Sequence, residues 1–100
     1  MTFANFGTLG VKPGHRDAIV ALLTRSNGEL AGAAGCLLYE VGVSDEHPDT
    51  VFVMELWISA EAHRASLQLE SVRAAIAEAM PMLSGDNTGT AFEVAGSPLR

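Results

Sequence analysis

Two predicted strands, residues 36–44 and 50–58, constrain the fold of this 100-residue chain most strongly, and residues 35–41 and 55–57 carry their alternating pattern. A period of two is typical of β-strands that bury one face. The polar segment 45–49 between them predicts a hairpin connection, so the two stretches are expected to be antiparallel neighbours. Each one also places an aromatic residue and a carboxylate in an apolar strand, namely Tyr39 with Glu40 and Trp57 with Glu55.

The residues before this pair predict a strand and then a helix. Residues 2–12 alternate as a strand, which Pro13 ends because proline keeps its predecessor extended and cannot donate to a sheet. From about residue 15 the apolar period changes to that of a helix. Glycines make its far end uncertain, and the helix is expected to stop between 26 and 33.

The residues after the pair predict helical segments and then a strand. Ser59 is suited to cap a short helical turn. A longer helix is then expected, which Pro81 ends or bends. Its apolar stripe consists of Leu69, Val72, Ile76, Met80 and Leu83. Residues 84–87 predict a turn, and residues 88–95 predict a fourth strand.

The predicted order is β-α-β-β-α-β, which is that of a ferredoxin-like α+β domain with a four-stranded antiparallel sheet. Helices then cover one face of the sheet. Residues 1–100 are expected to form a single domain. Because the strands carry apolar residues on both sides, a second subunit is expected to cover the other face, giving a homodimer.

The charge and composition argue against several classes of protein. The net charge is −6, and six basic residues are scattered along the chain, which disfavours nucleic-acid binding. No apolar run has the roughly 20 residues of a membrane span, and no signal peptide is recognised, so a cytoplasmic protein without membrane contact is expected. Cys36 is the one cysteine, which excludes a disulfide framework and a thiolate metal cluster.

Several short motifs resemble those of the antibiotic biosynthesis monooxygenase (ABM) family. They are Lys12-Pro13-Gly14, Gly35-Cys36 with Tyr39-Glu40, and Glu55-x-Trp57. Each motif is degenerate, but their order and spacing extend over residues 3–95. The resemblance implies a dimeric α/β barrel with a pocket between the sheet and helices of each subunit. It also implies that the C-terminal strand reaches the partner subunit.

The members of the family that this chain resembles differ in their activities. Some members oxidise polycyclic aromatic substrates such as anthrones with molecular oxygen, without a metal or flavin. Others degrade haem or isomerise small molecules. Such an oxygenase needs a dry pocket, a base and hydrogen bonds to the developing enolate. The resulting hypothesis is a cofactor-independent monooxygenase that acts on a small aromatic or quinol-like substrate.

Three residues are the candidates for catalysis. Trp57 could stack on the substrate and donate its indole N–H, or could anchor the end of its strand. His63 could shuttle protons from the short helix above the pocket, or could lie on the surface. Tyr39 could hydrogen-bond a substrate oxygen, or could fill the core.

Three further residues are candidates for substrate binding. Asn5 is a polar residue in an apolar strand, where it could point into the cavity. Glu55 could act in acid–base chemistry, or could pair across the dimer with a basic side chain. Ser66 is a weaker candidate, which a helix surface would also explain. No metal ligands are predicted.

The chain departs from its relatives at the positions that define their substrates. Many relatives carry histidines where this chain has Ser66 and Ser71, and anthrone-oxidising members carry asparagine and tyrosine where it has Val53 and His63. Residues 67–83 lack the axial histidine of haem-degrading members. Two alternatives therefore stay open, a non-catalytic dimeric binding module and an isomerase of the same fold.

Overall fold

A computed structural model describes residues 2–25 and 35–100 of the chain. The strands are β1 (Phe3–Gly10), β2 (Cys36–Ser44), β3 (His47–Trp57) and β4 (Thr88–Glu93). The helices are α1 (Arg16–Arg25), α3 (Ala60–Ser66) and α4 (Glu70–Ala79), and the 3-10 turn η1 (Met80–Met82) follows α4. Within the described residues, no helix has the length and apolar character needed to cross a bilayer.

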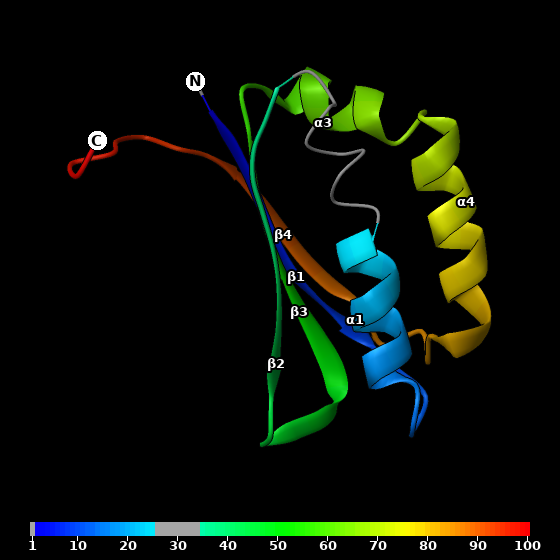
Figure 1. Cartoon of the computed structure of the whole chain (residues 1–100). Coiled ribbons are helices and arrows are strands. Elements are labelled where there is room, and N and C mark those ends of the chain that lie inside the picture. Colours follow the sequence, from blue (N-terminus) through cyan, green and yellow to red (C-terminus); the bar gives the residue numbers. More distant parts are fainter. Residues whose placement is uncertain (1, 26–34) are drawn as a thin grey trace.

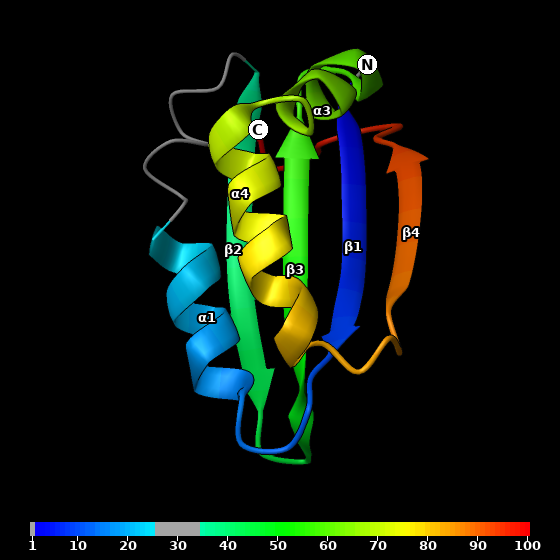
Figure 2. The same ribbon diagram turned by 90° about the vertical axis from the view of Figure 1, so that its right-hand side faces the viewer.

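The strands form one antiparallel sheet in the order β2-β3-β1-β4. All the labelled helices lie on the same side of this sheet, and the C-terminal tail leaves on the other side (Figure 1). Seen face on, α1 lies at the β2 edge of the sheet and α4 crosses in front of β2 and β3, whereas β4 has no helix in front of it (Figure 2). The fold is therefore the ferredoxin-like α+β arrangement that the sequence predicts.

The strand register decides which side chains face the helices. Asn5 on β1 pairs with Glu55 on β3, which pairs in turn with Tyr39 on β2. Directly opposed residues share a face of the sheet, so these three polar side chains form a row on the helix side. The core lies toward one end of this face, where Val11, Ile19, Leu22, Val51 and Ala79 are buried together.

The hairpin is tighter than predicted, because the turn occupies only residues 45 and 46 and β3 begins at His47. The expectation of a connection over 45–49 is wrong. Its basis was the polar character of these five residues, among which Pro48 cannot donate to a sheet. However, the β1 ladder ends at the Gly10–Thr50 pair, so no strand of the sheet extends alongside Pro48 on that side. A proline at the beginning of a strand is therefore tolerated.

The other boundaries differ by a few residues. Val11 leaves the β1 ladder to form an isolated bridge with Leu83, which ends the strand before residue 12. Pro81 ends the long helix as predicted, since α4 stops at Ala79 and Pro81 lies in the 3-10 turn that begins at Met80. Leu83 is consequently extended and not part of the helical stripe. The predicted stop of the first helix, at 26–33, lies outside the described residues.

Candidate active site

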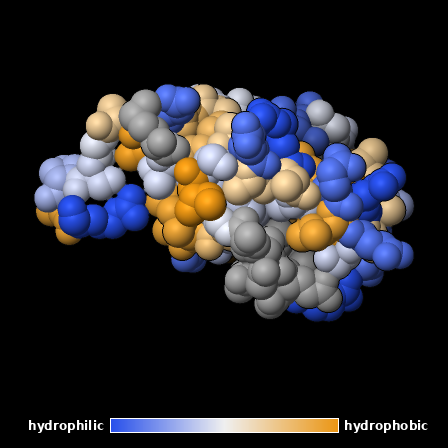
Figure 3. Space-filling model, turned by 90° about the horizontal axis from the view of Figure 1, so that it is seen from above, coloured by the Kyte–Doolittle hydropathy of each residue, from blue (hydrophilic) through white to orange (hydrophobic). Residues whose placement is uncertain are grey.

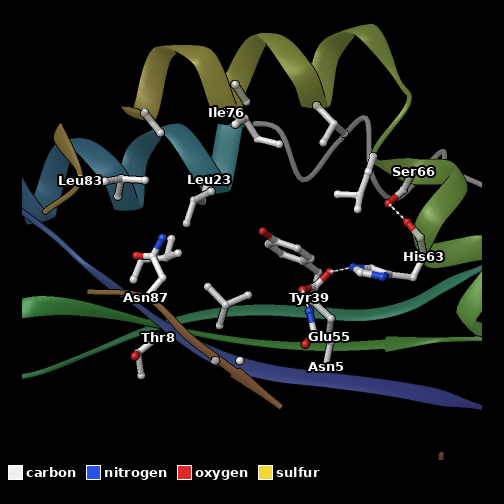
Figure 4. A pocket seen from close by; sticks show the side chains of 18 of the residues that line it. Asn5, Thr8, Leu23, Tyr39, Glu55, His63, Ser66, Ile76, Leu83 and Asn87 are labelled. Carbon is white, nitrogen blue, oxygen red and sulfur yellow. Dashed lines mark hydrogen bonds and ion pairs between the residues drawn. The ribbon is translucent and has the colours of Figure 1, made fainter. Parts of the chain in front are cut away.

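A cavity of about 450 Å³ lies between the sheet and the helices α3 and α4. Its wall is mostly apolar, and α4 and its continuation contribute Val72, Ala75, Ile76, Ala79, Met80 and Leu83. Polar side chains gather at one end, where Asn5, Tyr39, Glu55 and His63 come from three strands and one helix (Figure 4). A cavity of this size, with a few convergent polar groups, is typical of a small-molecule site.

Glu55 is the centre of the polar cluster. Its Oε2 accepts a hydrogen bond from Asn5 Nδ2 over 3.1 Å, and its Oε1 accepts one from Trp57 Nε1 over 3.2 Å. The same Oε1 lies 3.7 Å from His63 Nε2. The side chains of His63 and Glu55 are only 16% and 14% exposed. A carboxylate held by several donors is fixed in place, so Glu55 orients the histidine beside it.

Two aromatic rings fix the His63 imidazole from its other sides. The Trp57 ring meets it edge-on with a centroid separation of 5.6 Å, and the Phe3 ring is tilted against it at 5.4 Å. Phe3 pairs with Trp57 in the β1–β3 register, so both rings come from the same end of the sheet. This apolar packing keeps water from two sides of the imidazole.

Local signals in the sequence position the helix that carries His63. Ser59 caps α3, as predicted, by accepting a hydrogen bond from the Ala62 backbone N–H over 3.1 Å. Gly35 supports the same helix from below, at a φ of +97°. A Cβ there would lie 2.7 Å from the Ile58 side chain and 2.9 Å from that of Ala62. Glycine at this position thus lets α3 sit close to the sheet.

Tyr39 lines the cavity beside the Glu55–His63 pair, and its hydroxyl points into the open space (Figure 4). Burial, followed by the negative charge of Glu55 and by Cys36, raises the pKa of Tyr39 to about 12. The phenol therefore stays neutral near pH 7 and can donate a hydrogen bond. Among the described residues, no hydrogen-bond partner of this hydroxyl is found, which leaves it available to a ligand.

Ser66 is buried in the cavity wall, where its hydroxyl donates to the His63 carbonyl over 2.6 Å. This bond closes the last turn of α3. The hydroxyl oxygen keeps its lone pairs, so Ser66 can still accept a hydrogen bond from a ligand.

Five of the six predicted site residues line the cavity, and Trp57 does not. Trp57 is fully buried behind Glu55, where it contacts the site through its indole N–H. In this position the Trp57 side chain has no exposed surface. Glu55 likewise points toward the helices of its own chain and finds its partners there, rather than on the side that a second subunit could cover.

The sequence did not single out Asn87, Phe3 or most of the apolar wall as site residues. Asn87 precedes β4 and lines the cavity at the end remote from His63 (Figure 4). The helical stripe of Val72, Ile76 and Met80 was visible in the sequence, but as a core-facing surface. Only the spacing between α4 and the sheet turns this stripe into a cavity wall, and that spacing has no local sequence signal.

The described residues contain no group of three or more histidine, cysteine, aspartate or glutamate side chains that could hold a metal ion. The side chains of these types at the cavity are the His63 imidazole and the Glu55 carboxylate, which already contact each other.

Comparison with protein families supplies independent information. The model of a family described as antibiotic biosynthesis monooxygenase matches residues 2–78. Among solved structures, a Chloroflexus aurantiacus protein provisionally named an antibiotic biosynthesis monooxygenase is 33% identical, with 97% of both chains covered and a TM-score of 0.81. Among curated proteins, none matches this sequence.

Two more distant structures extend the likeness of the fold. A Deinococcus radiodurans protein with the same provisional name is 26% identical, with a TM-score of 0.82 and coverage of 97% of this chain and 95% of its own. A Caulobacter crescentus protein, again so named, is 21% identical, with a TM-score of 0.87 over 95% of this chain and 91% of its own. At that identity, the last likeness concerns the fold alone.

Proposed function

Because the chain belongs to the antibiotic biosynthesis monooxygenase family, we propose that it is a cofactor-independent monooxygenase. It oxidises a small aromatic or quinol-like substrate with molecular oxygen in the cavity. The observation that carries this proposal is the buried pair of His63 and Glu55 at the end of an apolar cavity. A base in a dry, apolar site is what deprotonation of such a substrate requires.

The reaction begins with proton transfer from the substrate to the His63 imidazole. Glu55 then stabilises the imidazolium that forms, just as a buried carboxylate supports the histidine of a catalytic triad. Glu55 itself is a poor candidate for the base, because Asn5 and Trp57 already donate to its two oxygens. Trp57 is thus a positioning residue, which acts through Glu55.

The deprotonated substrate then reduces oxygen directly. Its carbanion gives one electron to O2, and the two radicals combine to a peroxide, which takes the proton back from His63. Loss of water from the peroxide leaves a carbonyl on the substrate. One oxygen atom is therefore retained by the product and the other leaves in water, so that the substrate supplies all the electrons.

The other polar residues bind the substrate oxygen. Tyr39 donates a hydrogen bond to the enolate, because its raised pKa keeps it protonated. Asn5 and Ser66 flank the same end of the cavity, and they orient the reacting edge of the ring. We place this reaction in the cytoplasm, in keeping with the single cysteine, Cys36, which is a free thiol.

The active form is a homodimer, in which two sheets pack together through their bare faces, the faces that no labelled helix covers (Figure 1). Phe6, Met54 and Phe92 lie on that face and are 44%, 40% and 46% exposed. Phe6 and Phe92 contact each other with ring centroids 5.7 Å apart. Viewed from above, hydrophobic residues gather at the sheet beside the projecting tail, and hydrophilic residues are frequent on the helical side (Figure 3). A partner subunit with the same face would bury this surface.

Oxygen uptake with dihydroanthracene- and naphthol-type substrates tests the proposed activity. We expect uptake by the wild-type protein and its loss in His63→Ala, and uptake that does not exceed this variant would contradict the proposal. Product analysis under nitrogen separates the alternatives. A product formed without oxygen would indicate an isomerase that uses the same His63–Glu55 pair, and binding without any product would indicate a binding module.

A further inference from the structure

We infer that Asn87 is a specificity-determining residue, which binds a second oxygen substituent at the end of the substrate remote from the reacting hydroxyl. This inference rests on the proposed function, because it takes the cavity to be the substrate site. Asn87 lines that cavity, and its side chain lies near Leu83, far from the His63–Glu55 pair (Figure 4). Asn87 is an exposed residue, and among the described residues its amide has no hydrogen-bond partner, so it is available to a ligand.

The loop that carries Asn87 is held firmly against the end of β1. The backbone of Gly10 donates to Asp86 over 3.1 Å and accepts from Ser84 over 2.9 Å. On the other side of Asn87, the Thr88 hydroxyl accepts a hydrogen bond from the Thr8 backbone N–H over 3.2 Å. Asn87 is therefore positioned before a ligand arrives, which lowers the cost of using its amide for recognition.

The floor between the two ends of the cavity is flat. Gly7 and Gly89 pair across β1 and β4, and both line the cavity. A Cβ on Gly89 would have only the Asn5 side-chain oxygen near it, at 4.0 Å. The space above Gly89 is thus open, whereas a Cβ on Gly7 would clash with the Thr88 carbonyl oxygen. A planar ring system can lie on the glycine backbone with one edge toward Glu55 and the other toward Asn87.

The register sets the length of a ligand that reaches both ends. Asn5 and Leu9 both line the cavity, and Asn87 lies beside Leu9 because Thr88 pairs with Thr8. Four residues of a β-strand extend over about 13 Å, so a single ring cannot contact both ends. The substrate is accordingly an elongated fused-ring compound with a hydroxyl or carbonyl at each end, since an amide can both donate and accept.

Calorimetric titration under nitrogen tests this inference with two probes, 2,6-dihydroxynaphthalene and 2-naphthol. The first has an oxygen at each end, and the second has only one. The full-length protein should bind the dihydroxy compound about fivefold more tightly than 2-naphthol. This preference exceeds the roughly twofold statistical advantage that a symmetric ligand has. In Asn87→Leu this preference should fall to about twofold.

Gln68→Leu is the matched control, because Gln68 is an exposed amide that does not line the cavity, and it should keep the full preference. Asn87→Ala repeats the test with a smaller side chain if Asn87→Leu does not fold. A wild-type protein without the preference, a preference that persists in both Asn87 variants, or no binding of either probe would overturn the inference. The titration measures binding and not turnover. A protein that shows the preference but takes up no oxygen in the activity assay would therefore contradict the monooxygenase and leave the Asn87 site standing.

Discussion

His63 Nε2 lies 3.7 Å from Glu55 Oε1, and the two side chains come from α3 and β3 to meet at the buried end of one cavity. The same carboxylate also accepts from Asn5 and Trp57. The position of the imidazole therefore depends on this acidic side chain as well as on the rings of Phe3 and Trp57, and the stability of that region depends on the carboxylate too.

Removing the Glu55 carboxylate should separate these two roles. Glu55→Ala leaves the donors of Asn5 and Trp57 without a partner in a buried place, which should lower the free energy of unfolding by about 1–3 kcal/mol. Glu55→Gln keeps an acceptor for Trp57, so it should lower the free energy of unfolding by less. Turnover in this variant should fall about 100-fold, because the charge beside His63 is gone. Urea unfolding and oxygen uptake measure the two effects, and equal destabilisation by both variants would contradict this account.

Gly35 and Gly14 allow backbone strain to be separated from a steric clash. Both have positive φ, but a Cβ on Gly14 would meet nothing within 4 Å, whereas one on Gly35 would press on Ile58 and Ala62. Gly14→Ala should cost about 1 kcal/mol of unfolding free energy. Gly35→Ala should cost about 2–4 kcal/mol and should also reduce turnover, since it displaces the helix of His63. If the two variants unfold at the same denaturant concentration, the close approach of α3 is not important.

Tyr39 should titrate far above the usual range of a tyrosine. The pKa of Tyr39 in the folded protein is raised from 10.0 to about 12, so the folded state holds this proton more tightly than the unfolded state. This contribution to stability is complete below pH 10 and is lost as the pH rises from 10 toward 12. The chain has a single tyrosine, so the phenolate absorbance reports on Tyr39 alone. A titration midpoint at 10, or an identical alkaline stability profile in Tyr39→Phe, would contradict the burial of its hydroxyl.

The homodimer should depend on the bare face of the sheet. Phe6→Arg places a charge in the centre of that face, so light scattering should give a monomer near the chain mass of 10.5 kDa. Leu69→Arg is the control, because Leu69 is a similarly exposed apolar residue on the helical side, and this variant should remain dimeric. A monomeric wild-type protein, or a Phe6→Arg variant of unchanged mass, would exclude association through this face.

The fold could be predicted largely because its signals are local. The alternation in residues 36–44, the N-cap at Ser59 and the break at Pro81 each act over a few residues, and all three hold in the structure. The hairpin connection was predicted too long, because the polar residues 47–49 belong to β3. Whether Pro48 is tolerated there depends on where β1 ends, which is a non-local fact.

The residues of the candidate site were largely predictable, but the contacts between them were not. Period-two alternation places Tyr39 and Glu55 in neighbouring strands, yet only the register makes them direct neighbours. The pairing of Glu55 with His63 depends on how α3 folds back over the sheet, which Gly35 permits. Asn87 had no signal, because its loop is fixed by backbone hydrogen bonds to Gly10, which is distant in the sequence.

The central claim is that the His63–Glu55 pair activates an aromatic substrate for direct reaction with oxygen. Mass spectrometry of the product formed under isotopically labelled O2 tests it most directly, with Gln68→Leu as a control outside the cavity. We expect one labelled oxygen atom in the product of the wild-type and control proteins, and none above the uncatalysed background in His63→Ala. Label that enters equally with His63→Ala, or a product whose oxygen comes only from water, would contradict the account.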